Sequence, residues 1–497
     1  MLEIGGTVND PGSILFNDGA ELLISTNTSL YGGGVVSMAD GFVEAASGSP
    51  VLTNTDNTIL GSGDLGAVDH SQSGWLLYLV NGSNGVIDAS ASTIPLTLDT
   101  GAAAVTNAGL IEATGVAGLT IENAVVDDSA GGAIFAGAGS IVTLQQADII
   151  GGSLSTSGTG IISTSNLGLA QLDGTSFAVT NTGRVDIDDG QTLSLEGFII
   201  NSGKFVVYGA NNPTQFRVLP KGVTLSGGGR IYLLSPSSEL TGLSSLAVLT
   251  NVDNNISGAG DIGDGSLTLI NDAKGVIVGS QSASLTIDTG SNTIVNAGII
   301  LARGAGGTDV ESAVANSGIL ESAGGVLTVN GVVSGAGSAM VYSGTVDFTS
   351  SFSQNVVFQG TTGVLELAQS QGYNGTISRF SKTGGTSLDL RDIGFVSSTE
   401  ATFSGTASGG VLTVTDGDHT VHITLCGDYL ASTFIASSDG HGGTIVVDPW
   451  KAASMAASHR FVAALAGLGG SAGGAILAGE SWSVREPVLV KPRTMLV

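Results

Sequence analysis

The chain has 497 residues, with 42 acidic and 15 basic side chains and a formal net charge of −27 at pH 7. No Lys or Arg occurs before Arg184, so a phosphate backbone would be repelled along the first third of the chain, and we expect no nucleic acid among its partners. Charged residues make up only 11% of the chain, against about 25% in an average globular protein. Ser, Thr, Asn and Gly must therefore form most of the surface, which suits carbohydrate and other neutral polar partners.

Short apolar, β-branched runs along the chain are each preceded by an Asn-x-Gly signal. The signal recurs at Asn107, Asn181, Asn201, Asn296 and Asn316. Two neighbouring pairs, 181/201 and 296/316, are each 20 residues apart, and one strand-plus-turn unit per period of about 20 residues is typical of a solenoid. Stacked Asn side chains at equivalent turns would form amide ladders that hold the coils in register. We therefore predict an all-β fold in which residues 1–345 form a right-handed parallel β-helix.

A longer segment of the chain is duplicated. The stretch VLTNTDNTILGSGDLG at 51–66 recurs as VLTNVDNNISGAGDIG at 248–263. The match continues downstream, so two related blocks cover about 51–111 and 248–300. We interpret them as one ancestral block of several coils that was copied once. The duplication supports a repeat architecture and indicates no particular chemistry.

Basic and aromatic residues are concentrated between residues 204 and 232. The candidates for glycan contact there are Lys204, Tyr208, Arg217, Lys221, Arg230 and Tyr232. In β-helix polysaccharide lyases, Arg or Lys neutralises and deprotonates an acidic sugar beside calcium-binding carboxylates. The grouping is therefore compatible with a polysaccharide-degrading enzyme, and also with a longer loop that carries ordinary ion pairs.

Three carboxylates in the segment RVDIDDGQTL are the candidate metal ligands. Asp186 and Asp188 share a strand face and Asp189 follows directly, so a Ca²⁺ site is one interpretation and a solvated turn at the strand end is the other. The segments GSGDLG and GAGDIGDG resemble calcium-binding nonapeptide repeats, but neither meets their full spacing. His419 and His422 would point to opposite faces of a strand, which argues against a metal site. We predict no catalytic and no cofactor-binding residues.

Residues 346–497 consist of three segments that differ in composition and in the pattern of their apolar residues. Residues 346–395 are rich in aromatic side chains and are predicted to form the end coils of the solenoid. Residues 396–449 alternate over VLTVTDGDHTVHITL, which predicts a small antiparallel β cap with a hairpin turn at Asp416-Gly417-Asp418. Cys426 lies in the apolar run HITLCGDYL and is predicted to be buried. Residues 450–497 form an Ala/Gly-rich, basic tail that we expect to be mobile or related to export.

Several of these segments resemble a known group of bacterial proteins. The Asn-x-Gly repeats, GVVSGAGSAMVYSGTVDF at 331–348 and LDLRDIGF at 388–395 are similar to the passenger regions of autotransporters and filamentous-haemagglutinin-like adhesins of proteobacteria. The resemblance covers most of residues 50–449. It implies an extracellular or bacterial cell-surface protein whose partners are host or bacterial surface glycans or proteins. Membrane association is expected only through an export or anchoring system. The start, MLEIGGTVNDPG, shows neither the basic nor the apolar region of a secretory signal peptide.

Three functions are compatible with the sequence. The leading hypothesis is a non-catalytic β-solenoid that acts in adhesion or extracellular matrix contacts. The first alternative is a β-helix lyase or hydrolase that acts on acidic glycans. The second is a structural spacer within a larger surface protein.

Overall fold

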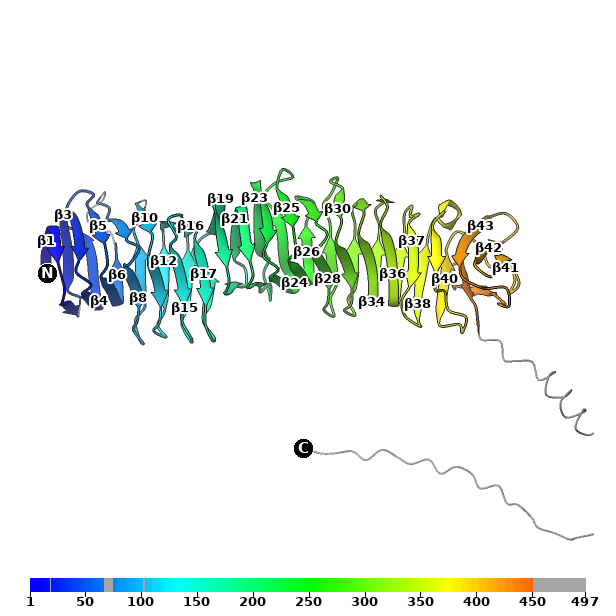
Figure 1. The fold of residues 1–497 in the computed structure, drawn as a ribbon, viewed down its shortest axis with the longest axis horizontal. Helices are drawn as coiled ribbons and strands as arrows, with labels where there is room; N and C mark the ends of the chain where they lie inside the picture. The colour runs from blue at the N-terminus through cyan, green and yellow to red at the C-terminus, as the bar shows by residue number, and fades with distance from the viewer. Residues whose placement is uncertain (18, 67–74, 102, 450–497) are drawn as a thin grey trace, which may run out of the picture. The chain divides into compact units, whose positions relative to one another are not determined.

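The fold is a long stack of parallel β coils. The computed structural model describes residues 1–17, 19–66, 75–101 and 103–449, and the predicted tail, 450–497, lies outside the described residues. About 16 turns follow one another along the stack (Figure 1), which confirms the predicted parallel β-solenoid. One short 3-10 turn, η1 (Ser370–Gly372), interrupts the strands. No helix within the described residues is long and apolar enough to cross a membrane.

Each coil contributes to three parallel sheets, which we call the first, second and third sheets. The strands of the first sheet alone are β5 (Val51–Asn54), β7 (Tyr78–Asn81), β10 (Ala104–Asn107), β13 (Val125–Asp127), β16 (Asp148–Ile150), β29 (Leu285–Ile287), β32 (Thr308–Val310), β38 (Gly363–Leu367) and β40 (Thr386–Leu390). Those of the second sheet alone are β2 (Ser13–Asn17), β8 (Val86–Ala89), β11 (Leu110–Ala113), β14 (Ala133–Ala136), β17 (Ser153–Thr156), β25 (Val248–Asn251), β27 (Thr268–Asn271), β30 (Ile294–Asn296), β33 (Val314–Asn316) and β35 (Val333–Ser334).

The third sheet has a similar number of strands. Those that belong to it alone are β9 (Leu96–Asp99), β12 (Leu119–Glu122), β15 (Ile141–Gln145), β18 (Ile161–Thr164), β20 (Arg184–Ile187), β22 (Lys204–Val207), β28 (Val276–Gly279), β31 (Ile299–Ala302), β37 (Asn355–Phe358) and β39 (Thr376–Ser378). Longer strands bend at a corner and serve two sheets: β1 (Leu2–Asn9), β3 (Glu21–Tyr31), β4 (Val35–Ala45), β6 (Thr58–Leu65), β19 (Ala170–Asn181), β21 (Thr192–Asn201), β23 (Thr214–Ser226), β24 (Arg230–Gly242), β26 (Asn255–Gly263), β34 (Ile319–Val329) and β36 (Ser338–Phe348).

Aliphatic rows fill the interior of the stack. In-register pairing places equivalent inward side chains of successive coils directly above one another, and one such row in the second sheet is Ile59, Ile87, Ile111, Ile134 and Leu154. Each of these side chains is at most 1% exposed. Burial of one such side chain contributes about 1.5–3 kcal/mol to folding. The core is therefore continuous from coil to coil, and no lobe of the stack has a core of its own.

Buried Asn side chains form the predicted ladders at the corners between the sheets. Each side-chain amide donates to the side-chain oxygen of the next coil over 2.7–2.9 Å, and the rungs of the longest ladder are Asn251, Asn271, Asn296, Asn316 and Gln354. A second ladder joins Asn54, Asn81, Asn107 and Asp128. A third joins Asn181, Asn201 and Asn254. The Asn rungs are all fully buried, so each ladder satisfies polar groups that water does not reach.

Equivalent strands of the two duplicated blocks belong to different sheets. The sheet that contains β5 continues through β7, β10, β13, β16 and β19 to the second half of β26. Its continuation is therefore not β25, whose sequence repeats that of β5; β25 belongs to the sheet of β8. The second block is thus rotated by one sheet relative to the first, and the Asn corner moves with it.

The first ladder ends where this change of corner begins. The coil after Asp128 carries Gly151 and Gly152 at the ladder position, and both have positive φ. A Cβ atom on Gly152 would approach the Cβ atom of Asp128 to 2.2 Å. No side chain can therefore continue the ladder there, and the next rung, Asn181, lies at the following corner.

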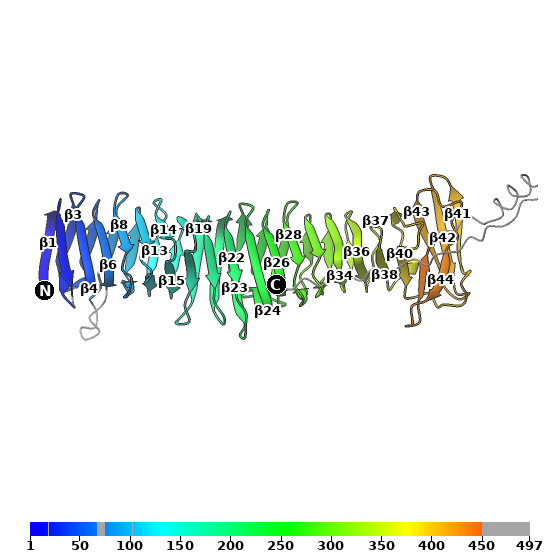
Figure 2. The same ribbon diagram turned by 90° about the horizontal axis from the view of Figure 1, so that it is seen from below.

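The C-terminal end has the predicted antiparallel cap. β41 (Ala401–Thr406), β42 (Gly409–Thr415) and β43 (Thr420–Cys426) pair as a meander, and β44 (Ile435–Ser438) pairs with β45 (Thr444–Val447) (Figure 2). β43 also pairs in parallel with β39, and β45 pairs antiparallel with β40, so the cap continues the stack. The predicted hairpin turn at 416–418 is confirmed.

Aromatic side chains connect the end coils to this cap. Phe348 stacks on Phe352 with ring centroids 3.6 Å apart, and the ring centroid of Phe380 lies 6.2 Å from that of Phe434 in the cap.

The prediction that Cys426 is buried was wrong, because its side chain is exposed. Strand alternation turns Ile423 and Leu425 into the core, so the next residue must face outward.

The Asn ladder should be a measurable source of stability. The Asn296→Ala substitution leaves the buried side-chain oxygen of Asn316 without its donor and removes one acceptor of the buried Asn271 amide. We expect the free energy of unfolding to fall by about 2–4 kcal/mol, measured by urea denaturation followed by circular dichroism. Asn330→Ala removes an exposed Asn and should change it by less than about 0.5 kcal/mol. Equal effects of the two substitutions would contradict the role of the ladder.

Asp128 should make the stability of the solenoid depend on pH. Burial raises the pKa of this carboxyl to about 7, and its Oδ2 atom has no hydrogen-bond partner among the described residues. The folded protein holds this proton more tightly than the unfolded chain, so the contribution of Asp128 is full below its unfolded pKa and is lost as the pH rises through about 7. Asp128→Asn should therefore be more stable than the wild type by up to about 4 kcal/mol near pH 8, with the advantage shrinking towards pH 4. Thermal denaturation across this range measures the difference, and a pH-independent difference would contradict the assignment.

Candidate functional site

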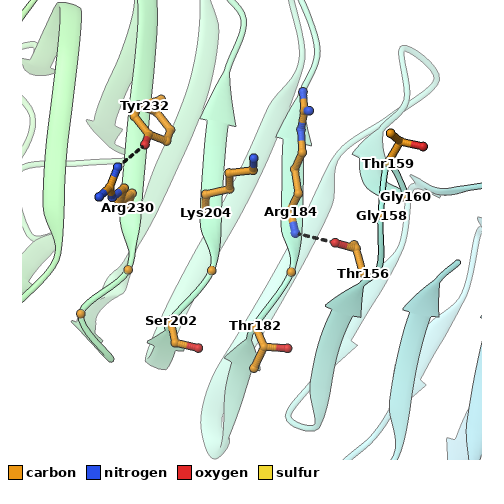
Figure 3. Close-up of a pocket in the computed structure, with 14 residues that line it drawn as sticks. Thr156, Gly158, Thr159, Gly160, Thr182, Arg184, Ser202, Lys204, Arg230 and Tyr232 are labelled. Carbon is orange, nitrogen blue, oxygen red and sulfur yellow. Dashed lines mark hydrogen bonds between the residues drawn. The ribbon is translucent and has the colours of Figure 1, made fainter. Parts of the chain in front are cut away.

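Three basic side chains form a column on the outer surface of the third sheet. Arg184, Lys204 and Arg230 are the first residues of β20, β22 and β24, and each pairs in register with the next (Figure 3). Neighbouring strands lie about 4.8 Å apart, so the three cations follow one line along the solenoid axis. We call these three residues the basic column.

Corner glycines bring the coils of the basic column close together. Gly183 and Gly203 directly precede Arg184 and Lys204. A Cβ atom on Gly203 would lie 2.1 Å from the carbonyl oxygen of Gly183. Only glycine fits this approach, and it fixes the point from which each basic side chain leaves the corner.

The basic column forms one wall of a shallow groove. The groove has a volume of about 520 Å³ and is lined mainly by glycine backbone, hydroxyl side chains and the column itself. Thr182 and Ser202 are exposed beside it, and Figure 3 shows them one coil apart on the side away from the cations. The Thr156 hydroxyl accepts a hydrogen bond from the backbone of Arg184 over 3.1 Å. The groove thus presents positive charge on one side and neutral hydrogen-bonding groups on the other.

The three cations are not equally available. Arg184 donates to both carboxylate oxygens of Asp186, at 2.8 and 3.0 Å, and this contact raises the pKa of its guanidinium. Arg230 donates to the Tyr232 hydroxyl over 3.0 Å, which leaves its charge uncompensated. The side-chain ammonium of Lys204 has no hydrogen bond or ion pair with any residue that the structure describes. Lys204 and Arg230 are therefore the charges free to meet an anion.

The residues predicted for glycan contact fall into two groups. Lys204, Arg230 and Tyr232 line the groove. Tyr208 reaches it indirectly, because its hydroxyl accepts a hydrogen bond from Arg184. The other two predicted residues, Arg217 and Lys221, belong to β23 and lie on a different surface.

The surface around Lys221 carries carboxylates. Lys221 contacts the Glu196 carboxylate at 3.1 Å, and Glu196 pairs in register with Asp173 on the neighbouring strand. Burial, together with the negative charges of Asp173 and Glu196, raises the pKa of the nearby Asp148 to about 6. A carboxyl that takes up a proton more readily than its neighbours is a feature of acid–base catalysis. The same feature arises whenever carboxylates are crowded on a sheet, so it does not by itself define an active site.

Sequence reasoning missed Arg184 as a member of the site. A signal was present, because TGRVD, SGKFV and GGRIY each place a basic residue directly after a glycine and before a strand. Only the second and third of these lie within the interval 204–232. The equivalence of the three positions depends on the register between coils.

The three predicted calcium ligands share one depression but do not converge. Asp186 is bound to Arg184. Asp188 accepts a hydrogen bond from Ser163 over 2.6 Å, and Asp189 accepts backbone hydrogen bonds from the loop at 211–212. Within residues 1–17, 19–66, 75–101 and 103–449, no group of three or more His, Cys, Asp or Glu side chains is placed to hold a metal ion. His419 and His422 bond to Asp416 and Thr413, respectively.

Comparison with known proteins adds no assignment. The chain matches no protein-family model, no curated protein and no solved structure. The resemblance to autotransporter passengers and filamentous-haemagglutinin-like adhesins therefore stays a prediction, and the groove must be interpreted from its own chemistry.

Proposed function

We propose that the protein is a non-catalytic, secreted or surface-displayed β-solenoid that acts in adhesion or extracellular matrix contacts. Its partners in this proposal are host or bacterial surface glycans or proteins. The observation that carries the proposal is the groove beside the basic column, which combines two free cations with exposed hydroxyls on a hydrogen-bonded sheet. Such a surface binds by contact, and its strands hold the binding groups in place before a partner arrives.

The location of the groove supports the proposal. The coils that carry the basic column lie between the two duplicated blocks, about 51–111 and 248–300. Five of the 15 Lys and Arg residues of the chain fall between Arg184 and Arg230. The duplicated blocks contribute length, whereas the coils between them carry a charge pattern of their own. This division of roles suits a scaffold that displays one contact site.

A polysaccharide-degrading enzyme is the second candidate. Lys221, Glu196 and Asp148 form a group of mixed charge in which the pKa of one carboxyl is raised. In this alternative Lys221 would neutralise an acidic sugar and a carboxyl would transfer the proton. The basic column would then only hold the substrate, because it belongs to another sheet.

The adhesion proposal predicts that binding depends on Lys204 and Arg230. The full-length protein should be retained on immobilised surface glycans or bacterial cells. A double variant, Lys204→Glu with Arg230→Glu, should lose at least about tenfold in affinity, because two charge-assisted contacts become repulsions. Arg303→Glu with Arg379→Glu changes the net charge equally at exposed sites elsewhere and should bind like the wild type. No binding to any glycan or cell at high protein concentration would contradict the proposal.

The two candidate functions predict different results with acidic polysaccharides. A non-catalytic protein releases no reducing or unsaturated ends from them over hours of incubation, measured by colorimetric assay and ultraviolet absorbance. Release that is abolished by Lys221→Ala and retained in Lys204→Ala would establish the enzyme and overturn the proposal. Lys221 is exposed, so its substitution should leave the fold intact.

A further inference from the structure

We propose that the groove binds a linear acidic polysaccharide, whose chain lies along the solenoid axis and places one anionic group near each of Lys204 and Arg230, the free members of the basic column. The proposal rests on the proposed function and narrows the partner to one chemical class. It follows from the register of the column, from the free charges and from the hydroxyl groups beside them.

The first argument is the repeat of the column. Arg184, Lys204 and Arg230 follow one another through in-register pairing, and the two strand spacings together span about 10 Å. The distance between successive sugar rings of an extended polysaccharide is comparable to one strand spacing. Charges on neighbouring sugars can therefore each meet a cation of the column. A polymer that crossed the sheet along a strand would meet only one member of the column. The match therefore sets the direction of the chain.

The second argument is the chemistry on the two sides of the groove. Lys204 and Arg230 offer charge that no described carboxylate neutralises, whereas the charge of Arg184 is neutralised by its ion pair with Asp186. Thr182 and Ser202 offer exposed hydroxyls one coil apart. A sugar acid carries an anionic group and several hydroxyls on one ring, so each sugar can use both sides of the groove.

The third argument is the short length of the column. The register positions next to it are Asn255 on one side and the region of Ile161 on the other, because Ile162 pairs with Val185. Neither position is charged. The column therefore suits a polymer whose charges are about one strand spacing apart and of which only a few are bound at a time. Duplex nucleic acid carries about one charge per 1.7 Å. Most of its phosphates would therefore meet no cation and would be repelled by a protein with a net charge of −27.

The test uses the full-length protein and polygalacturonate as the probe. Isothermal titration calorimetry with oligogalacturonides of increasing length should show affinity that rises until the chain spans the column and then levels off. The fully methyl-esterified polymer has the same backbone without its charges and should bind at least about tenfold more weakly. Binding should also weaken with salt, since it depends on exposed charges.

Substitutions then assign the binding to the column. Lys204→Ala and Arg230→Ala should each reduce the affinity about tenfold, and Lys204→Arg should retain it because the charge stays in place. Arg303→Ala removes an exposed cation from a distant coil and should have no effect. Circular dichroism melting curves confirm that each variant is folded.

Several outcomes would overturn the inference. Equal affinity for the esterified polymer, or equal losses of affinity in Lys204→Ala and Arg303→Ala, would show that the column does not recognise the anionic groups of the polymer. Tighter binding of single-stranded DNA than of polygalacturonate would show a general polyanion site. Self-association that is lost in Lys204→Glu would show that the partner is an acidic surface of a second copy. If neutral glycans or cells are still bound in these cases, the proposed adhesion function stands without the acidic ligand.

Discussion

Hydrogen bonding between successive coils, residue for residue in register, is the constraint on which the other features of this protein depend. Parallel pairing places each inward aliphatic side chain above its equivalent and each corner residue above the next corner. One buried Asn per coil then suffices to build a ladder, because its amide donates to the side-chain oxygen of the following rung. The same repetition acts on the outside of the stack. Three basic residues at one register position become a column without any further device.

The rotation of the second duplicated block shows how a solenoid changes its surface without breaking its core. The aliphatic rows continue through the coils after Asp128 while the Asn corner moves by one sheet. Small residues make this possible, since Gly151 and Gly152 leave no side chain at the old corner. The basic column begins in the first coil after the new ladder starts, three residues beyond Asn181. The change of corner therefore creates a local surface that neither duplicated block has.

Over the described coils, the exterior is largely acidic and the basic column forms a short cationic line on it. The acidic exterior favours solubility and, outside the basic column, repels polyanions. Where carboxyls are buried or crowded, the pKa values of Asp128, Asp148 and Asp389 rise to between about 6 and 7, because the charged form loses its hydration. Lys204 and Arg230 lie side by side on neighbouring strands, and no described carboxylate pairs with either of them. A specific anion would gain most at this place.

The sequence by itself determined the class of fold, the amide ladders and the antiparallel cap. These features are local or periodic: Asn-x-Gly turns recur with the coils, and the hairpin at 416–418 lies between two alternating strands. The exposure of Cys426 also follows from alternation along its strand. The prediction that it is buried was wrong because it was based on the apolar residues next to it in the sequence. Only the tertiary structure decided which residues share a sheet. Coil lengths vary, with 20 residues from Arg184 to Lys204 and 26 from Lys204 to Arg230, so sequence distance does not give the face. Arg184 therefore joins the column, and Lys221 lies elsewhere, because the pairing of backbone groups between coils sets the register.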